Sequence, residues 1–244
     1  MMNSNASKRF YAAQEILTTE QSFYEILYLL DDQFRTYIKK RNVVPASDFE
    51  KIFSNLGTLR DFSQEILNGL QQRINEWNEE SSKIADVLAR IGPFMRLFYV
   101  YINSLTQNLH NFEKLQAEHP KFKEAVLNFE DFPNCKKMKI CDYFMAPFQR
   151  LPRYQLLLAT YHKELKPNSV DYEDAFKALE IVTEAVDHVN ALMRKSELFH
   201  KIISLNSRIG HDIIKKQRIV IKEGPVSMVK SPVAACDPKY KVTR

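Results

Sequence analysis

The spacing of apolar residues between Ile140 and Leu165 constrains the fold of this chain most strongly. Eight apolar residues follow one another there at alternating steps of four and three, namely Ile140, Phe144, Pro147, Leu151, Tyr154, Leu158, Tyr161 and Leu165. Because an α-helix has about 3.6 residues per turn, these steps place all of them on one side of a helix. Pro147 and Pro152 lie inside the pattern, and each removes a backbone donor and favours a kink. The segment therefore predicts a kinked helix with one side in the core.

Similar patterns of three and four recur along the chain, and the composition agrees with them. Only five of the 244 residues are glycine, 45% are hydrophobic and 27% are charged, a profile typical of a globular protein. The expected fold class is all-α, a bundle of about six long helices. No window reaches the ~18 uninterrupted apolar residues that a membrane span needs, and the N-terminus lacks the apolar core of a signal peptide. We therefore expect a cytoplasmic protein.

The patterns also predict where the helices lie and how they begin. The expected helices cover about residues 8–41, 47–77 with an interruption at Gly57, 84–91, 94–115, 122–129, 138–166 and 172–203. Ser47 and Glu50 have the spacing of a capping box, and Asp171 is a candidate N-cap of the last helix. The expected core residues of that helix are Phe176, Leu179, Val182, Val186, Val189 and Met193.

One residue of the first helix does not fit its apolar side. That side consists of Ala13, Leu17, Glu20, Tyr24, Leu27, Asp31, Phe34 and Ile38. Glu20 could lie at its edge, in water. Alternatively, Glu20 projects into a surface that a partner covers, where a carboxylate accepts strong hydrogen bonds.

Two stretches resemble the conserved blocks of Dbl-homology domains. The string Ala146-Pro147-Phe148-Gln149-Arg150-Leu151-Pro152-Arg153-Tyr154, followed after one residue by three leucines, is similar to the family's signature helix, K/x-P-V-Q-R-I/L-x-x-Y-x-L-L-L. Ala146 and Phe148 depart from the usual lysine and valine. Periodicity alone would equally fit a core helix whose charged groups reach water. Residues 15–23 resemble the family's first block, E-L-L-x-T-E-x-x-Y, whose second glutamate matches Glu20 and whose tyrosine is replaced by Phe23.

The resemblance implies a function that needs no covalent chemistry, cofactor or metal. Dbl-homology domains are elongated helical guanine nucleotide exchange factors for Rho-family small GTPases. They bind the switch regions of the GTPase and promote GDP release and GTP loading. The implied GTPase-binding residues are Glu20, Gln149, Arg150, Arg153, Asn190 and Arg194. In the family, the residue at Glu20 contacts switch I and the residue at Asn190 contacts switch II, whereas Gln149 and Arg150 are expected to be partly structural.

Other functions remain open from the residues alone. A helical scaffold is one, and a degenerate Dbl-homology domain that binds a GTPase without activating it is another, because Ala146 cannot supply the charge of a lysine. An α-helical isoprenoid synthase is a third, but Asp31-Asp32 lacks the further aspartate that a magnesium-diphosphate site needs.

The C-terminal part differs from the helical body in charge and in pattern. Residues 211–244 contain eight basic and three acidic side chains, which give +5, whereas residues 1–210 contain 27 of each. The body is therefore not expected to bind nucleic acid, and the tail is a candidate for binding an anionic plasma membrane. Two short β runs around Gly224 resemble the truncated beginning of a pleckstrin-homology domain, most like the faciogenital-dysplasia type of exchange factor. Cys135, Cys141 and Cys236 have no zinc-site spacing and are expected to be free thiols.

Overall fold

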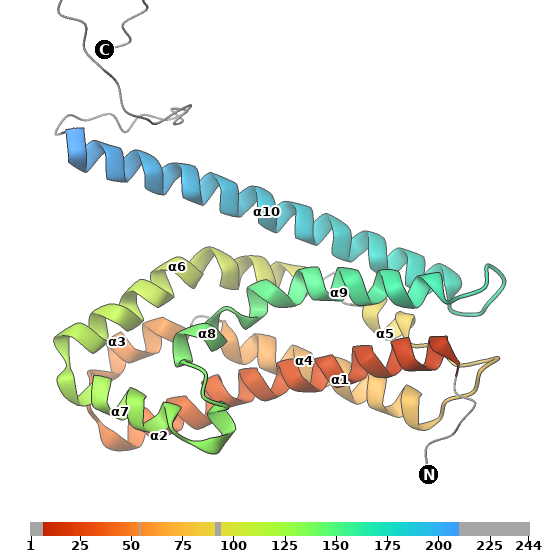
Figure 1. Cartoon of the computed structure of the whole chain (residues 1–244), viewed down its shortest axis with the longest axis horizontal. Coiled ribbons are helices and arrows are strands. Elements are labelled where there is room, and N and C mark those ends of the chain that lie inside the picture. Colours follow the sequence, from red (N-terminus) through yellow and green to blue (C-terminus); the bar gives the residue numbers. More distant parts are fainter. Residues whose placement is uncertain (1–6, 54, 91–93, 210–244) are drawn as a thin grey trace, which may run out of the picture. The chain divides into compact units, whose positions relative to one another are not determined.

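Every regular element in the described residues of the first unit is a helix. The structure is a computed structural model that describes residues 7–53, 55–90 and 94–209, and the chain divides into the units Met1–Leu192 and Met193–Arg244. Six α-helices of the described part have more than ten residues: α1 (Lys8–Tyr28), α4 (Leu56–Asn75), α6 (Met95–Glu118), α7 (Pro120–Glu130), α9 (Ala146–Lys163) and α10 (Tyr172–Ile209) (Figure 1). The all-α prediction is confirmed, while the predicted β runs lie outside the described residues.

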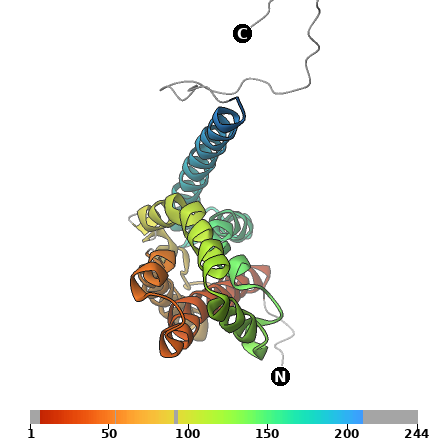
Figure 2. The same cartoon turned by 90° about the vertical axis from the view of Figure 1, so that its left-hand side faces the viewer.

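Four of these helices enclose the core of the first unit. α1 packs against α4 and α9, and α6 packs against the same two helices, so the four surround a common interior (Figure 2). Leu17 and Leu27 of α1, Phe98 of α6 and Leu158 of α9 are fully buried or nearly so. Burial of side chains of this size stabilises the fold by about 1.5–3 kcal/mol each.

Short helices and phenylalanines close one end of the bundle. α2 (Arg35–Arg41), α3 (Ala46–Glu50) and α8 (Ile140–Phe144) lie there beside α7 (Figure 1). Ring centroids are 4.9 Å apart for Phe49 and Phe53 and 5.2 Å apart for Phe34 and Phe129. These edge-to-face contacts give the end a rigid aromatic core.

The segment with the strict spacing of apolar residues is buried on one side as predicted. The eight apolar residues with this spacing, from Ile140 to Leu165, are all buried, which confirms the assignment. The segment consists of α8 and α9 with a break at Met145. Pro147 lies in the first turn of α9, where a missing donor costs nothing, and Pro152 lies inside the helix.

The first predicted helix, residues 8–41, has the expected bounds but an irregular middle. α1 continues through a π-helical segment, Leu29–Phe34, into α2. Asp31 in this segment is buried and pairs with Arg35 at 2.7 Å and with Arg60 at 2.8 Å. Asp31 therefore lies in an ion-pair network with two arginines rather than in a diphosphate site.

Two local predictions about the start and the interruption of the second predicted helix were wrong. The capping box does not form, because α3 begins at Ala46 after Pro45 and the Glu50 carboxylate pairs with Arg35 and Lys39 instead. The break in the second predicted helix falls at Asn55, which has a left-handed φ of 58°, and not at Gly57.

The buried side of α10 is lined by smaller residues than predicted. Phe176 is 46% exposed. Among the α10 residues whose side chains are described, the buried ones are Ala175, Ala178, Val182, Ala185, Val186 and Val189. Alanine lets a helix approach its neighbours closely. The larger Phe176 lies at the margin of the contact, with its ring centroid 5.9 Å from that of His162 of α9. Within the described residues, no helix is long and apolar enough to cross a membrane.

Candidate functional site

Glu20 lies in the core of the bundle, where three helices meet. Its side chain has no exposed surface. Its Oε1 atom accepts a hydrogen bond from Ser63 Oγ of α4 at 2.5 Å. Its Oε2 atom accepts bonds from Arg150 Nη2 at 2.6 Å and from Tyr154 OH at 2.5 Å, both on α9. One carboxylate therefore joins α1, α4 and α9.

Arg150 is buried with Glu20. Its guanidinium stacks on the ring of Tyr154 at 4.0 Å and on the ring of Phe23 at 5.5 Å. Burial acts to lower the pKa of Arg150, but its contacts with Tyr154 and Glu20 outweigh burial and raise it. Burial, reinforced by the charge of Glu20, raises the pKa of Tyr154 well above its usual value. Arg150 therefore stays charged, and Tyr154 keeps the proton that it donates.

The burial of Glu20 corrects the expectation that it projects from the surface, whereas the burial of Arg150 agrees with the expectation that this residue is partly structural. Glu20 occupies a position on the apolar side of α1, so the helix turns it into the core. The carboxylate is tolerated there because a cation and two hydroxyls satisfy it.

The other predicted residues of the signature helix reach the surface directly above Arg150. Gln149 and Arg153 are exposed and line a groove of about 310 Å³ between α1 and α9. The groove is completed by Thr19, Ser22, Phe23, Ile26, Ala146 and Arg150. Arg153 Nη2 lies 3.9 Å from the Glu15 carboxylate, and both side chains are more than half exposed. The groove thus combines an apolar floor with a polar, charged rim.

A second hollow of about 350 Å³ adjoins this groove along α1 and shares Ser22 and Ile26 with it. Its far side is the loop between α7 and α8, which contributes Lys136 and the exposed Met138. Lys136 and Lys137 have left-handed φ values of 48° and 61°. Non-glycine residues rarely adopt this conformation, so the loop has a defined shape beside the groove.

The last two predicted residues lie on α10. Asn190 is exposed and follows the buried Val189. α10 is linked to α9 by the hydrogen bond from Gln155 Nε2 to Thr183 Oγ1 at 3.1 Å, and Asn190 lies about two helical turns beyond Thr183. Arg194 is exposed and belongs to the second unit.

Two exposed residues of this face were not predicted. Glu15 matches the first glutamate of the family's block, so the sequence did hold a signal for it. Leu156 is 67% exposed, whereas Leu157 and Leu158 beside it are buried. An apolar side chain this exposed, one turn from Arg153, has no role in the fold.

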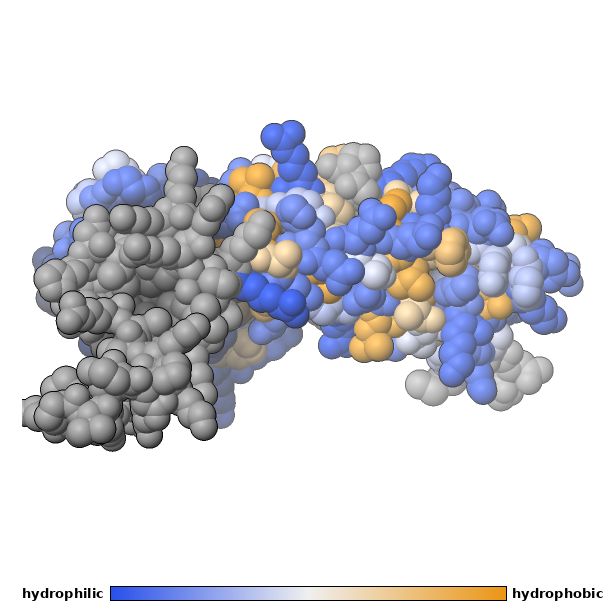
Figure 3. Space-filling view, turned by 90° about the horizontal axis from the view of Figure 1, so that it is seen from above, coloured by the Kyte–Doolittle hydropathy of each residue, from blue (hydrophilic) through white to orange (hydrophobic). Residues whose placement is uncertain are grey.

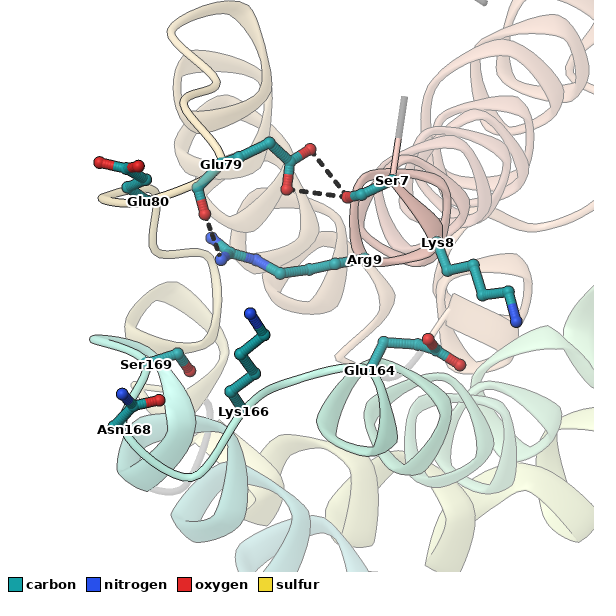
Figure 4. A pocket seen from close by; sticks show the side chains of 9 residues that line it. All are labelled: Ser7, Lys8, Arg9, Glu79, Glu80, Glu164, Lys166, Asn168 and Ser169. Atoms are coloured by element: carbon teal, nitrogen blue, oxygen red, sulfur yellow. Dashed lines mark hydrogen bonds between the residues drawn. The ribbon is translucent and has the colours of Figure 1, made fainter. Parts of the chain in front are cut away.

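A further hollow of about 630 Å³ lies elsewhere, where the start of α1 meets two loops. None of the predicted site residues lines it. Arg9 donates to the backbone carbonyl of Glu79, and Ser7 donates to the Glu79 carboxylate (Figure 4). Arg9 also donates to the backbone carbonyl of Ser82. Three cations and three carboxylates line it together, so the hollow has no net charge to attract a charged ligand.

Nucleophilic chemistry has no support in the described cysteines. Cys135 and Cys141 are free thiols, as predicted. Burial, followed by nearby carboxylates, raises the pKa of both, which disfavours the reactive thiolate. In the view from above, the coloured part of the surface is mainly hydrophilic with scattered apolar residues (Figure 3).

In this bundle, the signature helix packs on the first helix and exposes Gln149 and Arg153 next to it. This arrangement agrees with the resemblance to Dbl-homology domains. The sequence model of the RhoGEF domain matches residues 12–190. The chain belongs to the RhoGEF domain family.

Known proteins of this family cover nearly the whole chain. It is 30% identical over 246 residues to FYVE, RhoGEF and PH domain-containing protein 4 of Homo sapiens, a match that covers 98% of this chain and 32% of the relative. It is 31% identical over 226 residues to FYVE, RhoGEF and PH domain-containing protein 3 of Mus musculus. This match covers 91% of this chain and 31% of the relative. The chain therefore spans about a third of the length of these relatives.

Solved structures show the same fold. The DH domain of FARP2 is 26% identical with a TM-score of 0.67, and the match covers 82% of this chain and 96% of that one. The DH/PH domains of p115-RhoGEF are 25% identical with a TM-score of 0.71. This match covers 84% of this chain and 58% of that one.

Proposed function

We propose that this chain is a guanine nucleotide exchange factor that accelerates GDP release from a Rho-family small GTPase. The observation that carries the proposal is the groove between α1 and α9, where Gln149 and Arg153 are exposed beside an apolar floor. The exposed Glu15 lies next to Arg153. Exposed charge over apolar surface is typical of a protein interface. The DH/PH domains of PDZ-RhoGEF, at 20% identity and a TM-score of 0.71, were solved in complex with RhoA, and we extend that class of partner to this chain.

Exchange by such a surface is a binding effect. A partner shifts an equilibrium only by its greater affinity for one state. If the surface binds the nucleotide-free GTPase more tightly than the GDP-bound form, it weakens GDP binding by the same factor. Which nucleotide then enters is decided by concentration, not by this chain.

The residues divide into two groups in this proposal. Glu15, Gln149, Arg153 and Asn190 contact the switch loops. Arg194, which belongs to the second unit, is a candidate contact on the family resemblance alone. Glu20 and Arg150 take part from beneath the surface. The second hollow, beside Lys136 and Met138, extends the interface along α1.

The test is release of labelled GDP from a panel of Rho-family GTPases, with and without the chain. We expect acceleration on at least one GTPase, and loss of it with Arg153→Glu, which reverses an exposed charge without touching the core. If no member of the panel responds, the proposal is wrong.

Ala146 favours one alternative, a domain that binds a GTPase without activating it. The residue leaves the groove open where many relatives supply a lysine. Capture of nucleotide-free GTPase without accelerated GDP release would identify this case.

A further inference from the structure

The buried polar side chains beneath the groove are not explained by contact with a partner. The Glu20 cluster consists of Glu20 of α1, Ser63 of α4, and Arg150 and Tyr154 of α9. Each member is at most 4% exposed. The exposed Gln149 and Arg153 are the immediate sequence neighbours of Arg150 and Tyr154.

Stability alone is a weak reason for such a cluster. A buried ion pair usually contributes no more than apolar side chains of similar volume would. Arg150 Nε is also buried without a hydrogen-bond partner, and an unmet buried donor is costly. An apolar core at these positions would serve folding at least as well.

The backbone of α9 has a particular need for side-chain anchors. Neither Pro147 nor Pro152 has an N–H group, so the carbonyl of Phe148, four residues before Pro152, receives no helical bond from it. The first turns of α9 are therefore held less firmly by their own backbone. Arg150 and Tyr154 lie one turn apart in this stretch, and both bond to the same Glu20 oxygen. Two anchors one turn apart fix the rotation of a helix about its axis.

We propose that Glu20 is a positioning residue for nucleotide exchange, which fixes the rotation of α9 so that Gln149 and Arg153 face the GTPase. The inference rests on the proposed function. A side-chain group lies about 6 Å from the helix axis, so a rotation of about 10° moves it by about 1 Å. Misplacement by about 1 Å can cost about a hundredfold in rate where geometry is decisive.

Two hydroxyls of the cluster provide a matched test. Ser63 and Tyr154 each donate to Glu20 at 2.5 Å from a buried position, but only Tyr154 belongs to α9. We expect Ser63→Ala and Tyr154→Phe both to lower the melting temperature. Only Tyr154→Phe should slow GDP release, by about tenfold. Equal exchange rates in the two variants would overturn the proposal.

A second variant removes both charges together. Glu20→Leu/Arg150→Met keeps similar volume, so we expect a melting temperature at or above wild type. GDP release should fall about ten- to a hundredfold, and amides of residues 146–153 should exchange with solvent faster. A stable double variant with full exchange activity and unchanged amide protection would contradict the proposal. A wild-type chain that activates no GTPase would instead refute the proposed function, and the amide measurement would still show whether Glu20 holds α9.

Discussion

Glu15 and Glu20 are the same residue type on the same helix, yet they lie in opposite environments. Five residues correspond to a rotation of about 140° around an α-helix. Glu15 therefore points to solvent beside Arg153, while Glu20 points into the core toward Arg150. The family block contains both glutamates, and only the three-dimensional arrangement separates a surface group from a buried one.

This difference gives the first prediction. Glu20→Ala leaves the Arg150 charge buried and unpaired, so we expect it to destabilise the fold by about 3–5 kcal/mol. Glu15→Ala removes an exposed group and should change stability by at most about 0.5 kcal/mol. If Glu15 makes a charge-assisted bond to the GTPase, its loss should slow exchange about ten- to a hundredfold. Thermal melting and GDP release measured on both variants decide the assignment, which is wrong if Glu15→Ala exchanges at the wild-type rate.

Ala146 gives a second prediction at the residue scale. It lies at the edge of the groove and is partly exposed, so a lysine there can extend into solvent without disturbing the core. We expect Ala146→Lys to have a free energy of unfolding within about 0.5 kcal/mol of wild type. It should accelerate GDP release more than wild type does, because a lysine can pair with a carboxylate of the GTPase. Ala146→Met adds comparable length without charge and serves as the control. Equal gains from both variants would show that charge is not the missing element.

At the scale of helices, periodicity predicted most of the fold and long-range contacts explain where it failed. The spacing from Ile140 to Leu165 identified a buried side because it depends only on local geometry. The burial of Glu20 depends on Ser63, Arg150 and Tyr154, which are 43, 130 and 134 residues away. Phe176 was misplaced because α10 packs through alanines, which carry little periodic signal. The π-helical segment, Leu29–Phe34, was not predicted, because no sequence pattern in it indicated a departure from the α-helix.

One buried carboxylate links three helices at the other end of the bundle. Asp171 Oδ2 accepts bonds from the backbone N–H groups of Ile84 and Ala85, at the start of α5 (Ala85–Ala89), and from Tyr161 OH of α9. The predicted N-cap of α10 thus uses its side chain for another helix. Burial raises the pKa of Asp171 above its usual value of 3.8, although these bonds oppose the shift.

The raised pKa determines the sign of a pH effect. A carboxyl group with a higher pKa in the folded state binds its proton more tightly there, so its contribution to stability is greatest below about pH 3.9. That contribution falls as the pH rises through the folded-state pKa. Asp171→Asn keeps an oxygen for the three donors but cannot ionise. We expect the stability of wild type relative to this variant to decrease from acid to neutral pH, as measured by melting both across that range. A difference that increases with pH would contradict the assignment.

At the scale of the whole molecule, charge separates the chain into two parts. Residues 1–210 are balanced, and residues 211–244 carry +5. Because residues 1–210 have no net charge, binding at their surface would depend on the positions of a few charged side chains rather than on a strong overall electrostatic field. The basic tail suits attraction to an anionic membrane surface, which would raise the local concentration of the domain beside membrane-bound partners.

The last prediction separates these two roles. Deletion of residues 211–244 should weaken binding to vesicles that contain phosphatidylserine, because basic residues near such a surface contribute about 1 kcal/mol each. Exchange on a GTPase free in solution should stay unchanged, since the proposed contact residues all precede the deletion. Binding of the intact chain should weaken with added salt, because exposed charges are screened beyond about 10 Å at 0.1 M. Vesicles of phosphatidylcholine alone are the control. Vesicle binding that survives the deletion, or that salt does not affect, would show that the membrane contact does not depend on the charge of the tail.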